Sequence, residues 1–425
     1  MHCLIVGGGL SGLSAAVYLA KEGVKSTIIE ASPKLGGKAY SFYSKKINLN
    51  IDNGQHLMLG CYNNTLDFID TISANDKIEI IKKVDIPFIS STGRTFLLKS
   101  SSNIYPLNLM SAFYNFELLS IKDKVNFGFL FFDIMIGKNL SGLSINEWLI
   151  KTKQTQNSIL VLWEPLVVSI FNCNLESASA EMFKDVLKEM FFSKNGFNFI
   201  IPKVPLSDLF SVNAEKYLKN KGNKIILSER VENIVLNEKK LEKIVTNKSI
   251  YTNFDKVIFA VPTYSLQPII KQYKDVSELD NFEYSPIIST FIKIKENILE
   301  KKYYALTNSP IHWVFNKNNY ISLVTSNAKD LIDLKDDVIF NIFKNELKKY
   351  FPFIEDNDFL DYQIIKEKRA TFILNEKLET IRAKFTLENN NVYFAGDWTN
   401  TGLPSTIESA IKSGKTTAKT IINSL

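Results

Sequence analysis

The sequence predicts an α/β fold that begins with a Rossmann-like βαβ unit, and three observations support this. A short apolar run covers residues 2–6, a glycine-rich turn follows at 7–12, and apolar residues then recur at helical spacing as far as Ala20. A second apolar run, Val24–Glu30, is expected to form the next strand. Short strand–helix–strand connections are typical of a parallel sheet, so a nucleotide-binding domain is expected.

The composition is that of a folded protein with an unusual aromatic content. The 425 residues allow two to three domains, and 45% hydrophobic with 23% charged residues exclude a disordered or collagen-like chain. The net charge is +6, yet only four of the basic residues are arginine, which argues against a nucleic-acid partner. The 30 Phe and 17 Tyr must be buried or must meet something apolar.

Cysteine spacing and the N-terminus predict a reduced, cytoplasmic protein. Cys3, Cys61 and Cys173 lie far apart, so neither a disulfide framework nor a metal site is expected. No basic segment precedes the first apolar run, which therefore resembles a strand more than a signal peptide. The most apolar internal run, residues 127–137, is too short to span a bilayer.

The pattern of the remaining chain predicts two interleaved domains. Residues 1–65, 203–262 and 386–425 are expected to form the nucleotide domain, and residues 66–202 and 263–385 an α+β substrate domain. Within the second domain, residues 105–200 are mostly helical, with no alternating pattern. Other helices are expected at 66–81, 212–221 and 337–350, a hairpin at 86–98, and further strands at 223–227, 232–236, 256–261, 287–294, 313–324, 362–374 and 392–395.

The first glycine-rich turn has the chemistry of a phosphate cradle. Gly7, Gly9 and Gly12 satisfy GxGxxG between a strand and a helix, where backbone N–H groups and the helix dipole favour an anion. Glu30 ends the second strand, where a carboxylate accepts hydrogen bonds from ribose hydroxyls. The glycines alone are also compatible with a purely structural turn. Together with the strand, the helix and the acid they favour a dinucleotide.

A second glycine pair favours FAD over NAD. Gly36, Gly37 and Lys38 follow Glu30 closely, and NAD binding does not require such a pair, although an ordinary loop would also contain it. The sequence has no second GxGxxG and no CxxC, which argues against a pyridine-nucleotide disulfide reductase.

The C-terminal segment is expected to supply another part of the cofactor site. An apolar strand ends at Gly396 and Asp397, and the residues from Ser405 to Glu408 fit a capping box that starts the last helix at about Ser405. A helix N-terminus directed at a flavin stabilises negative charge on the reduced ring. The alternative is a cap with a structural role only.

Three segments together resemble the FAD-dependent amine oxidase and phytoene desaturase superfamily: VGGGLSGLSAAVYLAKEG with Glu30, LGGKAYS, and FAGDWTNTGLPSTIESAIKSG. DNGQHLMLGCY, WEPLVVSIFNCNLESASA and PKVPLSDLF resemble its squalene-associated branch, the hydroxysqualene dehydroxylases. The resemblance implies a Rossmann-like FAD-binding domain of the amine oxidase/glutathione reductase-2 type, with a discontinuous α+β substrate domain that carries a helical insertion.

The resemblance also implies the cofactor contacts. FAD is expected to be non-covalent, because no cysteine lies near Gly396, and Val231 is expected beside the adenine. Lys38 stands where the superfamily usually has arginine, so a bidentate phosphate contact becomes a point charge. The full set of expected contacts is Gly7, Gly9, Leu10, Ser11, Gly12, Glu30, Ala31, Gly36, Gly37, Lys38, Gly54, Gln55, Val231, Gly396, Asp397, Thr406 and Ile407.

The resemblance places Gln55 and His56 beside the flavin ring. The reaction it implies is the reductive removal of an allylic hydroxyl from hydroxysqualene, in squalene and hopanoid synthesis. Loss of that hydroxyl requires a proton, which His56 is expected to donate or relay while Gln55 positions the hydroxyl or the ring. A structural role for His56 is the alternative. A carotenoid-type desaturase, a flavin amine oxidase and a non-catalytic flavin-binding or membrane scaffold remain alternatives for the whole protein.

The aromatic residues predict a hydrophobic isoprenoid substrate and a peripheral membrane contact. We expect this contact in the helical insertion, on the inner face of the cytoplasmic membrane, with part of the aromatic content in ordinary core. No motif identifies an electron donor or an oligomeric state. The aromatic and basic residues concerned are Phe113, Phe116, Phe127, Phe129, Phe131, Phe132, Lys122, Lys124 and Lys138.

Overall fold

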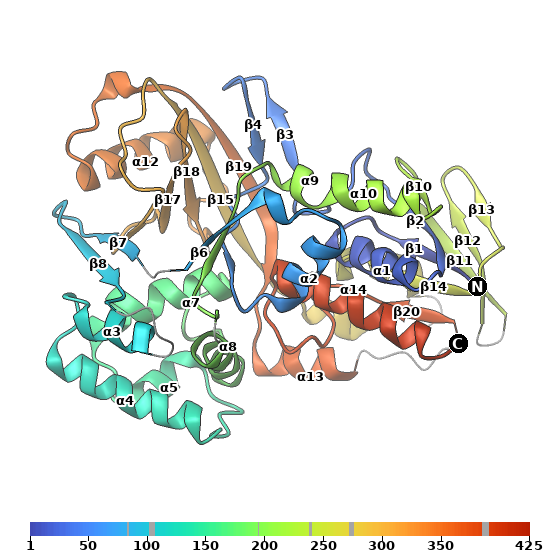
Figure 1. Ribbon diagram of the computed structural model, residues 1–425, viewed down its shortest axis with the longest axis horizontal. Coiled ribbons are helices and arrows are strands. Elements are labelled where there is room, and N and C mark those ends of the chain that lie inside the picture. The colour runs from blue at the N-terminus through green and yellow to red at the C-terminus, as the bar shows by residue number, and fades with distance from the viewer. Residues whose placement is uncertain (83–84, 102–106, 194, 238–239, 272–275, 385–390) are drawn as a thin grey trace.

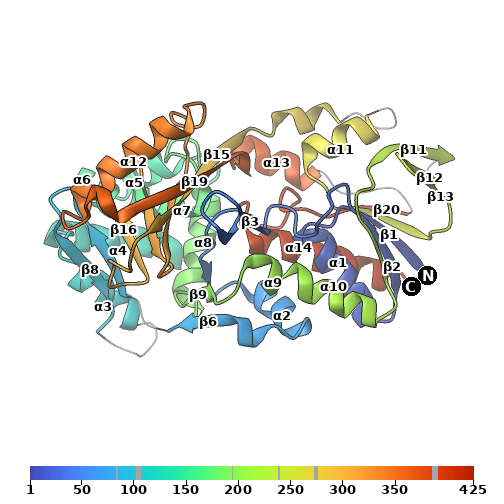
Figure 2. The same cartoon turned by 90° about the horizontal axis from the view of Figure 1, so that it is seen from above.

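A computed structural model describes residues 1–425 except 83–84, 102–106, 194, 238–239, 272–275 and 385–390. The expected boundaries at residues 105 and 386 therefore fall outside the described residues. The chain forms an α/β structure in which a parallel sheet and a larger mixed sheet lie at opposite ends of the long axis (Figures 1 and 2). Both termini lie at the end that holds the parallel sheet (Figure 1).

The parallel sheet has five strands in the order β10-β2-β1-β14-β20, and all its pairings are parallel. Alternate residues of β1 face opposite layers: Cys3 and Ile5 pack against helices, whereas Leu4 and Val6 belong to the core on the other side. Strands buried on both faces explain the continuous apolar runs in the sequence. The strands are β1 His2–Val6, β2 Lys25–Ile29, β10 Lys224–Ile226, β14 Lys256–Phe259 and β20 Val392–Phe394.

Helices cover one face of this sheet, and a small antiparallel sheet with one helix covers the other (Figure 2). Gly414 lets α14 approach α1, because a Cβ there would lie 2.1 Å from the carbonyl oxygen of Ser11. The covering helices are α1 Leu10–Lys21, α2 Asn63–Thr71, α9 Leu206–Leu209, α10 Ser211–Asn220 and α14 Ile407–Ile422, with β11 Val231–Asn237, β12 Lys240–Thr246, β13 Ile250–Tyr251 and α11 Thr263–Ile270 opposite.

A mixed seven-stranded sheet, β19-β15-β18-β17-β16-β7-β8, forms the other half. Only β16 and β7 pair in parallel, and α12 packs on one face through Ile339, Phe343 and Leu347. The expected hairpin at 86–98 is confirmed as β7 and β8. The elements are β7 Asp85–Ile89, β8 Thr95–Lys99, β15 Tyr284–Ile294, β16 Tyr303–Leu306, β17 Trp313–Asn316, β18 Tyr320–Thr325, α12 Asp336–Tyr350 and β19 Phe359–Phe372.

The expected helical insertion is confirmed over the described part of residues 107–192 (Figure 1). Its elements are α3 Leu107–Asn115, α4 Ile121–Met135, α5 Ile145–Lys151, α6 Gln156–Ser158, a π-helical turn Ile159–Trp163, α7 Glu164–Phe171 and α8 Ala180–Phe192. Among the described residues, no helix is long and apolar enough to cross a membrane.

The expected helix over 66–81 is wrong in its second half. The helix α2 ends at Thr71 before Ser73, which has a left-handed φ of 55°, and a short 3-10 turn, Asn75–Lys77, leads into β6, Ile78–Ile81. The isoleucines of β6 favour a strand. This strand pairs with β9, Phe199–Pro202, which also pairs with β5, Met58–Leu59. The remaining elements are β3 Ser41–Ser44, β4 Leu49–Asp52, 3-10 turns Ser277–Asn281 and Asp356–Asp358, and α13 Glu376–Lys384.

Candidate functional site

The turn between β1 and α1 is so tight that it excludes side chains. Gly7 has a φ of 109°, and a Cβ there would lie 2.5 Å from the carbonyl oxygen of Ala260. A Cβ on Gly12 would lie 2.0 Å from the carbonyl oxygen of Gly7. Gly9 is the N-cap residue of α1 and has no side chain to satisfy the helix N–H groups. The turn therefore presents the backbone amides of the first helical turn, which includes Leu10 and Ser11, to an anion.

The second glycine pair lies directly against this turn. The amide of Gly36 donates to the carbonyl oxygen of Gly8 at 2.9 Å, and Gly36 forms a parallel bridge with Gly9. A Cβ on Gly37 would lie 3.0 Å from the Cα of Gly9. Two segments separated in the sequence thus form a single backbone cradle that side chains would fill, which fits a dinucleotide pyrophosphate.

Glu30 is held at the edge of this cradle, just past β2. One carboxylate oxygen accepts from the amide of Gly8 at 2.6 Å and the other from the amide of Ser32 at 2.7 Å, so Ala31 lies within a carboxylate-bridged turn. The remaining lone pairs can accept ribose hydroxyls. The amide of Glu229 donates to the carbonyl oxygen of Glu30, which brings the chain leading to Val231, the first residue of β11, beside the same edge.

Lys38 leaves the cradle and contacts the half of the molecule that holds the seven-stranded sheet. Its ammonium donates to the carbonyl oxygen of Ala370 in β19 at 2.9 Å and lies 5.8 Å from the centre of the Tyr284 ring. The expected phosphate contact of Lys38 stays a prediction. The observed contact ties the loop after Gly37 to the seven-stranded sheet.

The segment Asn53–His56 runs between the two halves. The side chain of Asn53 donates to the carbonyl oxygen of Lys38 at 3.1 Å, and Gly54 has a φ of 111° that places it against β15. A Cβ on Gly54 would lie 3.2 Å from Oγ of Ser289. The segment therefore connects the glycine cradle to β15 of the seven-stranded sheet, and Gln55 and His56 follow at that junction.

His56 has an enclosed ring nitrogen without a partner. Its Nε2 is shielded from solvent and makes no hydrogen bond to the described protein atoms. Burial lowers the pKa of His56 below its ordinary value, and the nearby Asp52 opposes this only in part. The imidazole is therefore neutral near pH 7. Since buried polar atoms are normally satisfied, this nitrogen fits a hydrogen-bonding group of a bound molecule. The Gln55 amide donates to the carbonyl oxygen of His56 at 3.5 Å.

The C-terminal strand brings another backbone approach to the same sheet edge. Gly396 follows β20, its amide donates to Oγ of Ser413 at 2.9 Å, and a Cβ there would lie 2.4 Å from Nε1 of Trp398. The carboxylate of Asp397 accepts from the hydroxyl of Ser405. Parallel strands present their carboxyl ends at one edge, so Gly396 lies on the same edge as Gly7.

The last helix starts one residue later than expected, and the Ser405 capping box is wrong. Thr406 is the N-cap, its hydroxyl accepts from the amide of Ser409 at 3.1 Å, and Ile407 is the first helical residue. Glu408 instead accepts from the amides at the start of α2, that of Asn64 at 3.0 Å and that of Thr65 at 2.8 Å. The carboxylate is favoured there because it satisfies free N–H groups at the positive end of α2.

Arg382 was not predicted as part of the site. The residue is 1% exposed, and its guanidinium organises the loop after Gly396. Burial lowers its pKa to about 10, against the opposing effect of Asp397. The acceptors are the carbonyl oxygens of Asp397, Trp398, Thr399 and Leu403 and the hydroxyl of Thr401. The only sequence signal is the rarity of arginine in this chain.

The fold and the cradle define a FAD-dependent oxidoreductase. Residues 10–422 match the model of the flavin-containing amine oxidoreductases, so the chain belongs to this family. It is 27% identical to a hydroxysqualene dehydroxylase of Zymomonas mobilis over 97% of each chain, and 23% identical to a 15-cis-phytoene desaturase of Arabidopsis thaliana over 99% of this chain and 80% of the relative.

Solved structures agree on the fold. Putative protoporphyrinogen oxidase from Exiguobacterium superposes with a TM-score of 0.73 at 16% identity, covering 100% of this chain and 99% of that one. Cyclohexylamine oxidase from Brevibacterium oxydans superposes with a TM-score of 0.74 at 13% identity, covering 100% of this chain and 99% of that one. The expected fold class, superfamily and cofactor are confirmed.

Proposed function

We propose that the protein removes the allylic hydroxyl of hydroxysqualene reductively and yields squalene, in squalene and hopanoid synthesis. The near full-length similarity to hydroxysqualene dehydroxylases supports this substrate. The observation that carries the chemistry is the enclosed Nε2 of His56, which has no hydrogen-bond partner among the described residues and follows the junction of the cradle and the seven-stranded sheet. Reduced FAD supplies the hydride when bound.

The residues of this chain supply the proton. The C–O bond breaks as the hydroxyl accepts a proton and leaves as water, and the same carbon receives the hydride, so the substrate gains two electrons. His56 protonates the hydroxyl through Nε2, the nitrogen without a partner in the described part of the chain. Since burial keeps the imidazole neutral near pH 7, His56 acts as a relay that must take up a proton for each turnover. Gln55 orients the hydroxyl.

Three segments would hold FAD. The backbone of Gly7–Gly12 and the Gly36–Gly37 pair enclose the pyrophosphate, and Glu30 accepts from the ribose. Thr406 and Ile407 begin the helix whose N-terminus stabilises negative charge on the reduced ring. We also place the reaction at the inner face of the cytoplasmic membrane, because a C30 hydrocarbon chain partitions into lipid and all three cysteines are free thiols.

A second candidate is a carotenoid-type desaturase, which the similarity to phytoene desaturases favours. In that reaction the protein holds a polyene precursor in the same place and hydride leaves the substrate. No leaving group then needs a proton, so His56 would have no acid role.

Replacement of His56 tests the proposal. We expect His56→Asn, loaded with FAD and reduced by dithionite without oxygen, to form squalene about a hundredfold more slowly than the parent. His312→Asn is the matched control, because His312 is a partly buried histidine directly before β17, and its Nδ1 accepts from the amide of Ser326. An unchanged rate in His56→Asn with normal FAD content would overturn the role of His56.

A further inference from the structure

The helix α4 leaves a continuous apolar face uncovered. Ile121, Val125, Phe129, Phe132 and Ile136 recur at helical spacing along it and just past its end, and each is between 48% and 83% exposed. Met135 extends the stripe at 63% exposed. Large apolar side chains in a contiguous row are not expected to face water and mark an interaction surface. We call these six residues the α4 face.

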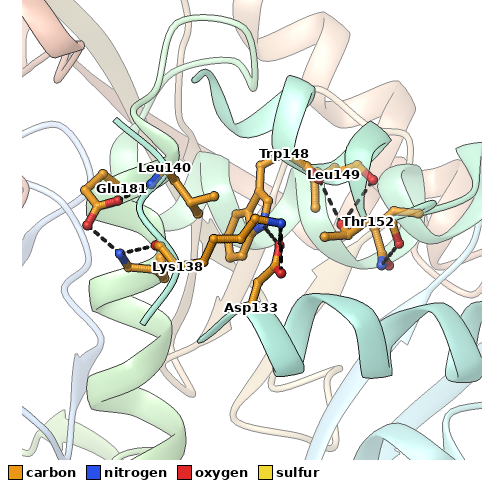
Figure 3. A network of polar contacts seen from close by, with 9 residues as sticks. Asp133, Lys138, Leu140, Trp148, Leu149, Thr152 and Glu181 are labelled. Atoms are coloured by element: carbon orange, nitrogen blue, oxygen red, sulfur yellow. Dashed lines mark hydrogen bonds and ion pairs between the residues drawn. The ribbon is translucent and has the colours of Figure 1, made fainter. Parts of the chain in front are cut away.

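The opposite side of α4 is fixed by buried polar contacts. Asp133 is buried, pairs with the ammonium of Lys138 at 3.0 Å and accepts from Nε1 of Trp148 at 3.0 Å, as Figure 3 shows. Asp123, also buried, caps the helix by accepting from Ser120. These contacts determine which side of α4 points inward, so the α4 face cannot turn into the core.

The same contacts leave the exposed charge of α4 purely positive. Both of its aspartates are buried, and its other charged residues are Lys122 and Lys124. Lys124 lies 5.4 Å from the ring centre of exposed Tyr114, and Lys153 lies 5.3 Å from that of Phe129. Lysines that extend along aromatic rings beside an apolar stripe form the pattern of a helix lying in a lipid interface.

We propose that the α4 face binds the surface of an anionic lipid bilayer, with the apolar stripe inserted among the acyl chains and the lysines at the headgroups. Of the phenylalanines expected to make such a contact, Phe129 and Phe132 lie on this face, whereas Phe113 and Phe116 are buried core. The positive charge beside the α4 face favours a lipid surface as its partner, because anionic headgroups complement lysines that border an apolar row. The nearest exposed carboxylate before the helix, Glu117, lies in the preceding turn. This inference does not depend on the proposed reaction.

Vesicle co-sedimentation of the FAD-loaded full chain tests it. The parent should sediment with vesicles of phosphatidylglycerol and phosphatidylcholine at low salt, and less with phosphatidylcholine alone. Phe132→Glu should lower the partition coefficient at least about tenfold. Phe353→Glu is the matched control, since Phe353 is equally exposed, 60% against 59%, but follows α12, which packs on the opposite face of the seven-stranded sheet from the helical insertion. Replacement of Lys122 or Lys124 by Gln should lower the partition coefficient on anionic vesicles about fivefold each.

Three results would overturn the proposal. The first is a parent that stays in the supernatant with anionic vesicles at low salt, and the second is that the Phe132→Glu and Phe353→Glu variants bind alike. The third is a parent that light scattering shows to be a dimer and that Phe132→Glu makes monomeric, because the face would then be covered by a second copy. Turnover of hydroxysqualene dispersed in detergent should be the same in Phe132→Glu and the parent, so failure of the membrane contact is separable from failure of the reaction.

Discussion

Replacement of Arg382 by methionine removes the donor that holds the loop after Gly396. Methionine retains the length and apolar stem of the side chain but offers no N–H group. Of the acceptors that Arg382 satisfies, the carbonyl oxygen of Asp397 also accepts from the hydroxyl of Ser409 at 3.2 Å, and that of Thr399 also accepts from the amide of Thr401 at 2.8 Å. The variant therefore removes a charged donor from several carbonyl oxygens of this loop at once.

The magnitude follows from these contacts. A lost hydrogen bond from a charged donor costs about 1.5–3 kcal/mol, and somewhat less when the acceptor keeps a second partner. We expect a loss of about 3–5 kcal/mol in the free energy of unfolding, and about 1–2 kcal/mol less in Arg382→Lys, whose ammonium can reach some of the acceptors.

Urea unfolding followed by circular dichroism measures the stability, and titration of the apoprotein with FAD measures the effect on the site. FAD affinity should fall in Arg382→Met, because the loop links Asp397 to the start of α14. The reasoning would be refuted by an Arg382→Met protein within about 1 kcal/mol of the parent that binds FAD equally well.

Three further predictions follow. Gly37→Ala should weaken FAD binding about tenfold, because the new Cβ would meet the backbone of Gly9. Gly23→Ala is the control: Gly23 also has a positive φ, but a Cβ there would have nothing within 4 Å, so FAD affinity should be unchanged in the same titration. Glu408→Gln should lower unfolding free energy by about 2 kcal/mol in urea, because two donors at Thr65 lose their carboxylate, and exposed Glu300→Gln should not. Burial lowers the pKa of His312 from 6.5 to about 4, so this histidine takes up a proton in the unfolded chain before it does in the folded protein as the pH falls. The free energy of unfolding should therefore drop by about 2 kcal/mol from pH 7 to pH 5. This part of the drop should vanish in His312→Asn.

The glycine cradle could be predicted from the sequence because each glycine answers a local requirement. Gly7 and Gly12 occupy positions where any side chain would collide with backbone, and the strand and helix beside them are periodic over short windows. The hairpin at 86–98 in the seven-stranded sheet could also be predicted, because its pattern is likewise local.

Elements that depend on distant partners could not be predicted in this way. The sequence pattern predicts that Glu408 caps its own helix, yet it caps α2, more than 300 residues earlier in the chain. Residues 78–81 continue the apolar pattern of α2, yet they form a strand because β9 pairs with them. The acceptors of Arg382 are mainly backbone carbonyls, which leave no mark in the sequence.

The anaerobic reaction of the reduced holoenzyme with hydroxysqualene tests the central claim most directly. The protein, loaded with FAD and reduced with one equivalent of dithionite, is mixed with the substrate while the flavin absorbance is recorded and the product is identified by mass spectrometry. The proposed function predicts recovery of the oxidised flavin spectrum with one squalene formed per flavin. A flavin that stays reduced until oxygen is admitted, or an oxidised enzyme that is instead reduced by a polyene precursor, would contradict it.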